Sequence, residues 1–245
     1  GKKQNPRIPT ALEDIQGTYK RQLEVAEQAI QATDFSHSPW HLIEAEDHNY
    51  RDITVGKIIL KALQARSATA TQPDNSQIVA TGSTADNSQQ PNLLGKLDLG
   101  LALDKDDYKK KLRKYQARLQ DLAWEAYRQK RPVVALFEGW DAAGKGSAIR
   151  RVTQSIDPRL YSLIQFAAPS DEERAHHYLW RFWRKLERDG RVTLFDRSWY
   201  GRVLVERVEN FAKDHEWQRA YSEIRDYENQ LLDHGSILLK FWIHI

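Results

Sequence analysis

The chain has 245 residues, of which 40% are hydrophobic and 29% are charged, a composition typical of a globular protein. The formal net charge of +3 does not by itself indicate nucleic acid as a partner. No apolar run is long enough to cross a membrane, and the N-terminus lacks the apolar core of a signal peptide. The absence of cysteine excludes a disulfide framework. We therefore expect a cytoplasmic protein that binds neither nucleic acid nor a membrane.

Residues 1–65 contain a mixture of helical and strand-like patterns. We expect a helix over residues 12–30, a short strand in PWHLIEAED after Pro39, and an apolar helix from Ile53 to Leu63. Residues 66–92 are rich in Ser, Thr, Asn, Gln and Ala, with scarcely any large apolar side chain. This composition cannot offset the entropy that is lost on ordering, so it predicts a flexible linker. Because the chain has no methionine and begins at Gly1, we also expect it to be processed or partial.

Residues 93–245 alternate between predicted strands and predicted helices. Apolar runs predict strands over residues 133–137, 161–166, 192–196 and 237–245. Helices are expected over residues 108–126, from about Ser147, over residues 175–190 and over residues 216–233. This alternation predicts an α/β fold with a mostly parallel sheet that helices cover on both faces.

The last predicted strand, ILLKFWIHI, would leave an unpaired edge in the sheet. The strand and helix predicted between Trp40 and Leu63 have the pattern that a fifth strand and a closing helix would have. Two interpretations are open. This segment either finishes an earlier, similar domain or packs against residues 93–245 as a substitute.

A glycine-rich motif follows the first strand of this region. It reads Gly139-x-x-x-x-Gly144-Lys145-Gly146 and leads into a helix, the context in which backbone N–H groups and a lysine bind phosphate. The alternative is an ordinary glycine-rich turn. Gly146 stands where such loops usually carry the Ser or Thr that holds Mg²⁺. Ser147 is expected to contact phosphate but not to replace that magnesium ligand.

Asp141 places a carboxylate inside this loop. Two like charges ~4 Å apart at an intermediate dielectric constant repel by about 4 kcal/mol, so Asp141 would weaken the binding of bare phosphate. A bridging Mg²⁺ reverses the sign, because it takes carboxylate and phosphate oxygens together. We therefore interpret Asp141 as a metal-organising acid, the alternative being an Asp that caps the following turn.

The stretch VTLFDRSWYGR supplies a second candidate site. Asp196 ends a predicted strand, where open α/β sheets bind ligands, and it is a second candidate for holding Mg²⁺. Arg197 and Arg202 follow, and each can bind phosphate with two hydrogen bonds; the alternative is a surface ion pair. A wider set of cations would line a groove for a polyanion if its members converge, and otherwise forms solvated helix faces. That set is Arg150, which we count as phosphate-binding, with Arg151, Arg181, Arg184, Arg207 and Lys213.

The motifs EGWDAAGKG, DPRLY, AHHYLWRFWRKL and FDRSWYGRVLVERVENF together resemble the polyphosphate kinase 2 family from about Leu93 to Ile245. The stretch DRSWYGRVLVERVE is most similar to the members that phosphorylate AMP, which can carry two family domains in tandem. The resemblance implies a P-loop kinase-like three-layer sandwich preceded by the tail of a similar domain. Residues 1–65 would be the C-terminal part of the first domain, residues 66–92 a linker, and residues 93–245 a second domain without its lid and closing elements.

The resemblance also implies an activity: transfer of the terminal phosphoryl group of inorganic polyphosphate to AMP, giving ADP, with Mg²⁺ as cofactor. Asp141, Lys145, Asp196 and Arg197 would then be catalytic. Three alternatives or open points accompany this interpretation. The chain could be an ATP-dependent nucleoside monophosphate kinase or a non-catalytic module that binds polyphosphate or nucleotide, and a homo-oligomer is left open.

Overall fold

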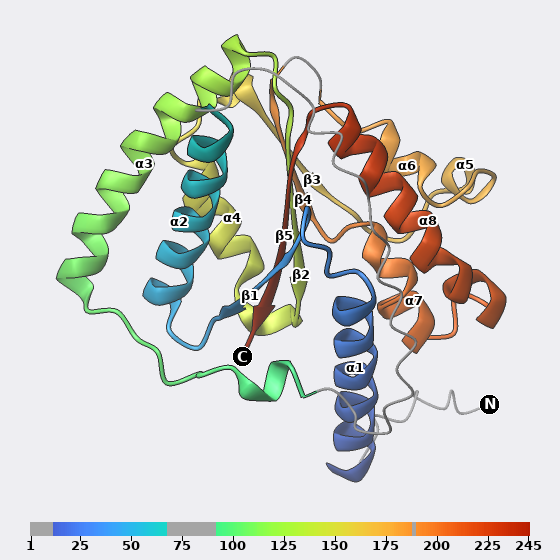
Figure 1. Cartoon of the computed structure of the whole chain (residues 1–245). Coiled ribbons are helices and arrows are strands. Elements are labelled where there is room, and N and C mark those ends of the chain that lie inside the picture. The colour runs from blue at the N-terminus through green and yellow to red at the C-terminus, as the bar shows by residue number, and fades with distance from the viewer. Residues whose placement is uncertain (1–11, 68–91, 188–189) are drawn as a thin grey trace, which may run out of the picture.

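The computed structural model describes residues 12–67, 92–187 and 190–245, and it contains a five-stranded parallel sheet (Figure 1). The strands are ordered β1-β5-β2-β4-β3 across the sheet, and every neighbouring pair is parallel. This confirms the expected α/β fold. The strands are β1 (Trp40–Glu44), β2 (Val133–Gly139), β3 (Tyr161–Gln165), β4 (Val192–Asp196) and β5 (Ile237–His244).

Helices cover both faces of the sheet and make a three-layer arrangement (Figure 1). One face packs against α2, α3 and α4, and the other packs against α1, α6 and α8. The helices are α1 (Leu12–Ala32), α2 (His48–Ser67), α3 (Lys105–Arg128), α4 (Lys145–Thr153), α5 (Asp171–Arg174), α6 (Trp180–Trp183), α7 (Val205–Val208) and α8 (Asp214–Asp233), with 3-10 turns η1 (Leu94–Lys96), η2 (Asp141–Ala143), η3 (Pro158–Leu160) and η4 (Trp199–Arg202).

The central strands form because their side chains are apolar on both faces. All eight residues of β5 are buried, and so are the first six residues of β2. Phe137 and Phe241 stack between these strands with their ring centroids 4.9 Å apart. A strand that is covered on both faces needs a continuous apolar run rather than alternation. This is the pattern from which the four strands of residues 93–245 were predicted.

The predicted helix over residues 175–190 is wrong as a single element. The structure instead has the short helices α5 and α6, separated by turns. A capping box between Ser170 and Glu173 starts α5 at Asp171. Phe182 then turns into the core against Phe166, whose ring centroid lies 4.4 Å away, while His176 stacks on Trp180 at 3.9 Å. Tertiary packing of these aromatic rings overrides the helical pattern.

The N-terminal segment supplies the edge strand next to β5. Trp40 to Glu44 of β1 pair in register with Lys240 to His244, and α2 packs on the same side of the sheet as α3. The segment therefore lies against the sheet of residues 93–245. The division into residues 1–65, 66–92 and 93–245 stays a prediction, because most of the expected linker, residues 68–91, lies outside the described residues.

A buried ion pair between β5 and α8 is hydrogen-bonded to this N-terminal segment. The Lys240 ammonium lies 2.9 Å from Oε2 of Glu228, and both side chains are almost completely buried. Lys240 also donates to the carbonyl of Thr33, at 2.7 Å. The other Glu228 oxygen accepts from the Trp199 indole at 3.1 Å and from the Tyr200 hydroxyl at 2.7 Å. The residue after α1, β5 and α8 thus share one hydrogen-bond network.

Lys240→Met should lower the free energy of unfolding by about 3–5 kcal/mol, because it leaves the Glu228 carboxylate buried without its partner. Adding Glu228→Gln should recover part of that loss. Lys20→Met, which removes an exposed partner of Glu24, should change the free energy by less than about 1 kcal/mol. Urea unfolding of the variants measures all three. If Lys240→Met lowered the free energy of unfolding as little as Lys20→Met does, the buried Lys240–Glu228 pair would not have the stabilising role given to it here.

Candidate active site

Two loops meet at the carboxyl edge of the sheet because β2 and β4 are neighbours. Phe137 lies in register with Asp196, and the backbone N–H of Arg197 donates to the Phe137 carbonyl at 3.2 Å. Asp196 thus ends β4 beside Phe137, close to Gly139, where β2 ends and the glycine-rich loop begins. The structure therefore brings together the two motifs that the sequence predicted to form one site.

The conformation of the glycine-rich loop requires two of its glycines. Gly139 has a φ of +127° and Gly144 a φ of +80°, which side chains of L-residues rarely adopt. A Cβ at Gly139 would also overlap the carbonyl of Ile243 in β5. Gly146 and Ser147 are exposed in the first turn of α4, where backbone N–H groups and the helix dipole favour an anion.

Lys145 stabilises the curl of the loop from within. Only 6% of its surface is exposed, and its ammonium donates to the carbonyls of Gly139 and Trp140, both at 2.7 Å. Burial lowers the pKa of Lys145, and the nearby Glu138 and Asp141 carboxylates raise it again. Two of the three ammonium protons are thus used by the loop, and the third can be offered to Asp141 or to a phosphate.

Asp141 is held between two cations. Its Oδ1 lies 2.9 Å from Nη2 of Arg197 and 3.8 Å from Nζ of Lys145. Asp196 accepts a hydrogen bond from the Gln165 amide at 3.3 Å, and its charge also acts on Lys145. The acid inside the phosphate loop is therefore balanced by the side chains expected to bind phosphate. This arrangement holds Arg197 beside the loop.

The two acids suit a hard divalent cation. Mg²⁺ is commonly bound through one or two carboxylates together with phosphate and water oxygens, and Asp141 and Asp196 supply carboxylates at one edge of the sheet. Within residues 12–67, 92–187 and 190–245, no group of three or more His, Asp or Glu side chains could enclose a metal. A cation bound here would therefore take its remaining oxygens from substrate and water.

Other predicted phosphate ligands have local partners. Arg202 pairs with Glu206 at 3.2 Å, and its guanidinium lies over the Tyr178 ring. Arg150 is exposed in the last turn of α4. Phosphate binding by these two arginines stays a prediction. Four arginines of the wider set also have a partner within the protein: Arg151 contacts Asp52, Arg181 contacts Glu173, Arg184 contacts Glu172 and Arg207 contacts Trp217. These contacts do not bring the arginines together in one groove.

Sequence reasoning missed Glu138, which joins the two loops. It is 6% exposed, and its Oε1 accepts from the backbone N–H of Ser198 at 2.7 Å and from the Ser198 hydroxyl at 2.8 Å. Burial raises the pKa of Glu138 to about 7, against the opposing effect of the Ser198 hydrogen bonds. An acid inside a run of buried strand residues was the only signal in the sequence.

The described part of the chain contains no helix that is long and apolar enough to span a membrane.

Glu138→Gln should flatten the pH dependence of stability. The Glu138 pKa of about 7 in the folded chain exceeds its ordinary value of 4.5, so the folded state binds this proton more tightly than the unfolded state does. That stabilisation is fully present below pH 4.5 and is lost as the pH rises through about 7. The glutamine keeps the Oε1 acceptor but cannot titrate.

The measurement is urea unfolding of both proteins across this pH range. Over it, the original chain should lose on the order of 3 kcal/mol more than the variant does. The same loss in both proteins would show that Glu138 does not titrate with the raised pKa.

Comparison with known proteins places these features in a family. The family model described as Polyphosphate kinase 2 (PPK2) matches residues 102–245. A polyphosphate:AMP phosphotransferase of Pseudomonas syringae pv. tomato is 46% identical over 228 residues, which are 93% of this chain and 45% of that protein. A protein of the same name from Pseudomonas aeruginosa is 48% identical over 231 residues, with the same two coverages.

The fold is shared as well. A crystal structure from Pseudomonas aeruginosa PA01 assigned to polyphosphate kinase 2 superposes with a TM-score of 0.61 at 45% identity, covering 96% of this chain and 48% of that chain. The chain thus spans about half the length of the curated relatives that it matches. The glycine-rich loop and the Asp196–Arg197 pair lie within the matched residues. This chain belongs to the polyphosphate kinase 2 family.

Proposed function

We propose that the chain transfers the terminal phosphoryl group of inorganic polyphosphate to AMP, giving ADP, with Mg²⁺ as cofactor. One observation carries the proposal: Lys145 and Arg197 both lie beside Asp141 in the glycine-rich loop. The relatives named polyphosphate:AMP phosphotransferase support this choice of donor and acceptor. The P-loop kinase-like fold supports the reaction class.

In this reaction an oxygen of the AMP phosphate attacks the terminal phosphorus of polyphosphate. The new P–O bond forms as the bond to the bridging oxygen breaks, and the shortened polyphosphate leaves with that oxygen. The transition state is loose and spreads negative charge over the equatorial oxygens, so catalysis rests on positioning and on cations. Lys145 and the loop N–H groups would bind the transferred group, and Arg197 would stabilise the charge that develops on it.

Asp141 and Asp196 would hold Mg²⁺, which when bound would supply positive charge to phosphate oxygens. The two acids have further roles that need no metal. Asp141 keeps the Arg197 guanidinium next to the loop at 2.9 Å. Asp196 lies in register with Phe137 of β2, and its negative charge favours the charged form of Lys145. These contacts organise the cationic side of the site in advance.

The first test is product analysis after mixing the chain with Mg²⁺, AMP and either polyphosphate or ATP. We expect ADP from polyphosphate, with one phosphate lost from the polymer for each ADP formed. Formation of ADP only with ATP would point to a nucleoside monophosphate kinase. Salt-sensitive binding of polyphosphate without any ADP would point to a binding module. Either result would overturn the proposal.

Lys145→Ala and Asp141→Asn should each lower the turnover number by about three powers of ten, the cost of losing one preorganised charge at such a site. Lys109→Ala is the matched control, since this exposed side chain on α3 pairs with the exposed Asp106. It should leave the rate within about twofold. Steady-state kinetics with AMP and polyphosphate provide the measurement, and near-normal turnover in either site variant would exclude the mechanism.

A further inference from the structure

The underside of the glycine-rich loop contacts a helix from outside the family-matched residues. Arg51 lies in the first turn of α2 and is 4% exposed. Its Nη1 donates to the carbonyl of Ala143 in the loop, 92 positions further along the chain, at 3.3 Å. A Cβ at Gly144 would overlap the same nitrogen. The guanidinium therefore packs directly against the loop backbone.

Four backbone carbonyls of the loop accept a hydrogen bond in the structure, and Arg51 is the donor to one of them. Gly139 and Trp140 are bonded through Lys145, Ala143 through Arg51, and Gly144 through the N–H of Ala148. A phosphate-binding loop needs its N–H groups directed at the anion, and a carbonyl turned toward the anion would repel it. Arg51 provides an internal donor that holds the Ala143 carbonyl on the protein side.

Asp52 stabilises the buried Arg51 charge and connects it to neighbouring helices. Its Oδ1 accepts from Nε of Arg51 at 3.0 Å and from Nη2 at 2.8 Å. Its Oδ2 accepts from the Tyr108 hydroxyl of α3 at 3.2 Å and lies 3.5 Å from Nε of Arg151. Arg151 is in the last turn of α4, the helix that follows the loop.

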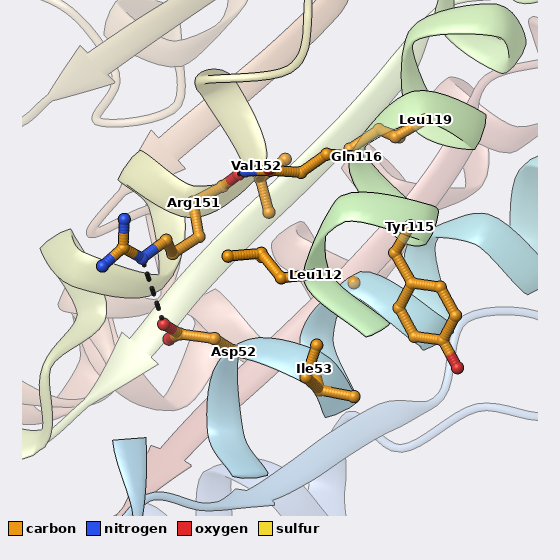
Figure 2. A pocket seen from close by; sticks show the side chains of 9 residues that line it. Asp52, Ile53, Leu112, Tyr115, Gln116, Leu119, Arg151 and Val152 are labelled. Carbon is orange, nitrogen blue, oxygen red and sulfur yellow. Dashed lines mark hydrogen bonds and ion pairs between the residues drawn. The ribbon is translucent and has the colours of Figure 1, made fainter. Parts of the chain in front are cut away.

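Figure 2 shows the Asp52–Arg151 ion pair between α2 and α4, beside a small pocket that α3 also lines. A buried arginine that is paired in this way costs far less than an unpaired one. Because the Arg51 charge is compensated within the pair, its role is geometric rather than electrostatic. Arg51 thus attaches the glycine-rich loop to α2, and Asp52 attaches the last turn of α4 to the same helix.

We propose that Arg51 is a positioning residue for the phosphate-binding loop and that the N-terminal segment is thereby part of the phosphate site. Arg51 touches the loop backbone from below and acts on phosphate only through the loop. The proposal rests on the proposed function in one respect: it assumes that this loop binds the polyphosphate donor.

The test is the binding of inorganic tripolyphosphate with Mg²⁺ by calorimetry, in the full chain and its variants. Arg51→Met removes the donor to Ala143 and should weaken binding about tenfold. Arg51→Lys keeps the charge beside Asp52 and one donor group, so its affinity should fall between the two. Ile59→Val trims a buried apolar side chain about two turns further along α2. It should lower stability and leave the affinity within about twofold.

Two further readouts separate positioning from general loss of structure. In Arg51→Lys the amides of residues 142–146 should exchange hydrogen faster, while those of β2 stay unchanged. If the chain transfers phosphate to AMP, the KM for polyphosphate should rise more than the turnover number falls.

Binding within twofold in Arg51→Met, or equal weakening by Ile59→Val, would overturn the proposal. If Arg51→Met does not fold, affinity and amide exchange in Arg51→Lys that match the original chain would overturn it. If the original chain binds tripolyphosphate but transfers nothing to AMP, the proposed function fails and the Arg51 comparison still stands. Absence of tripolyphosphate binding by the original chain would overturn both.

Discussion

The parallel pairing of β2 with β4 is the constraint on which the candidate site depends. Parallel strands end at the same edge of a sheet, so the loops that follow them meet there even though they are far apart in sequence. The register places Phe137 opposite Asp196, and the Arg197 N–H donates to the Phe137 carbonyl. A shift of this register by one residue would separate the glycine-rich loop from the acid and arginine that it needs.

Within that frame, the cations at the site each have a partner in the protein. Lys145 is bonded to two carbonyls of its own loop, and Arg197 is bonded to Asp141. Arg197 also has a φ of +66°, an unusual backbone conformation for a non-glycine residue, of the kind that clusters at functional sites. Electrostatic stabilisation is most effective when its donors do not have to reorganise during the reaction. In the proposed mechanism, the Asp141 carboxylate would serve this purpose by keeping the Arg197 guanidinium beside the loop.

How much of this could be predicted from the sequence depended on whether the signal was local. Strands β2, β4 and β5 were predictable because a doubly covered parallel strand is a continuous apolar run. The loop was predictable because its glycines and lysine have fixed spacing. The helix over residues 175–190 failed because Phe182 and Trp180 pack individually against distant rings or a neighbouring histidine. The place of β1 stayed open because an apolar run predicts a strand without naming its partner. Glu138 was hidden inside a strand.

The contacts of the N-terminal segment connect residues that carry no phosphate motif to the glycine-rich loop and the sheet. Lys240 ties the Thr33 carbonyl into the core, β1 covers the exposed edge of β5, and Arg51 supports the loop from α2. The loop's own Lys145 holds the carbonyls of Gly139 and Trp140, whereas the Ala143 carbonyl is bonded to Arg51 of α2. Part of the rigidity of the loop therefore comes from α2. The buried Arg51 guanidinium, with its five donors, satisfies the Ala143 carbonyl and the Asp52 carboxylate at the same time. A lysine ammonium can also contact both kinds of oxygen, as Lys240 does, but all its donors share one nitrogen and it lacks the planar fork that binds a carboxylate through two nitrogens.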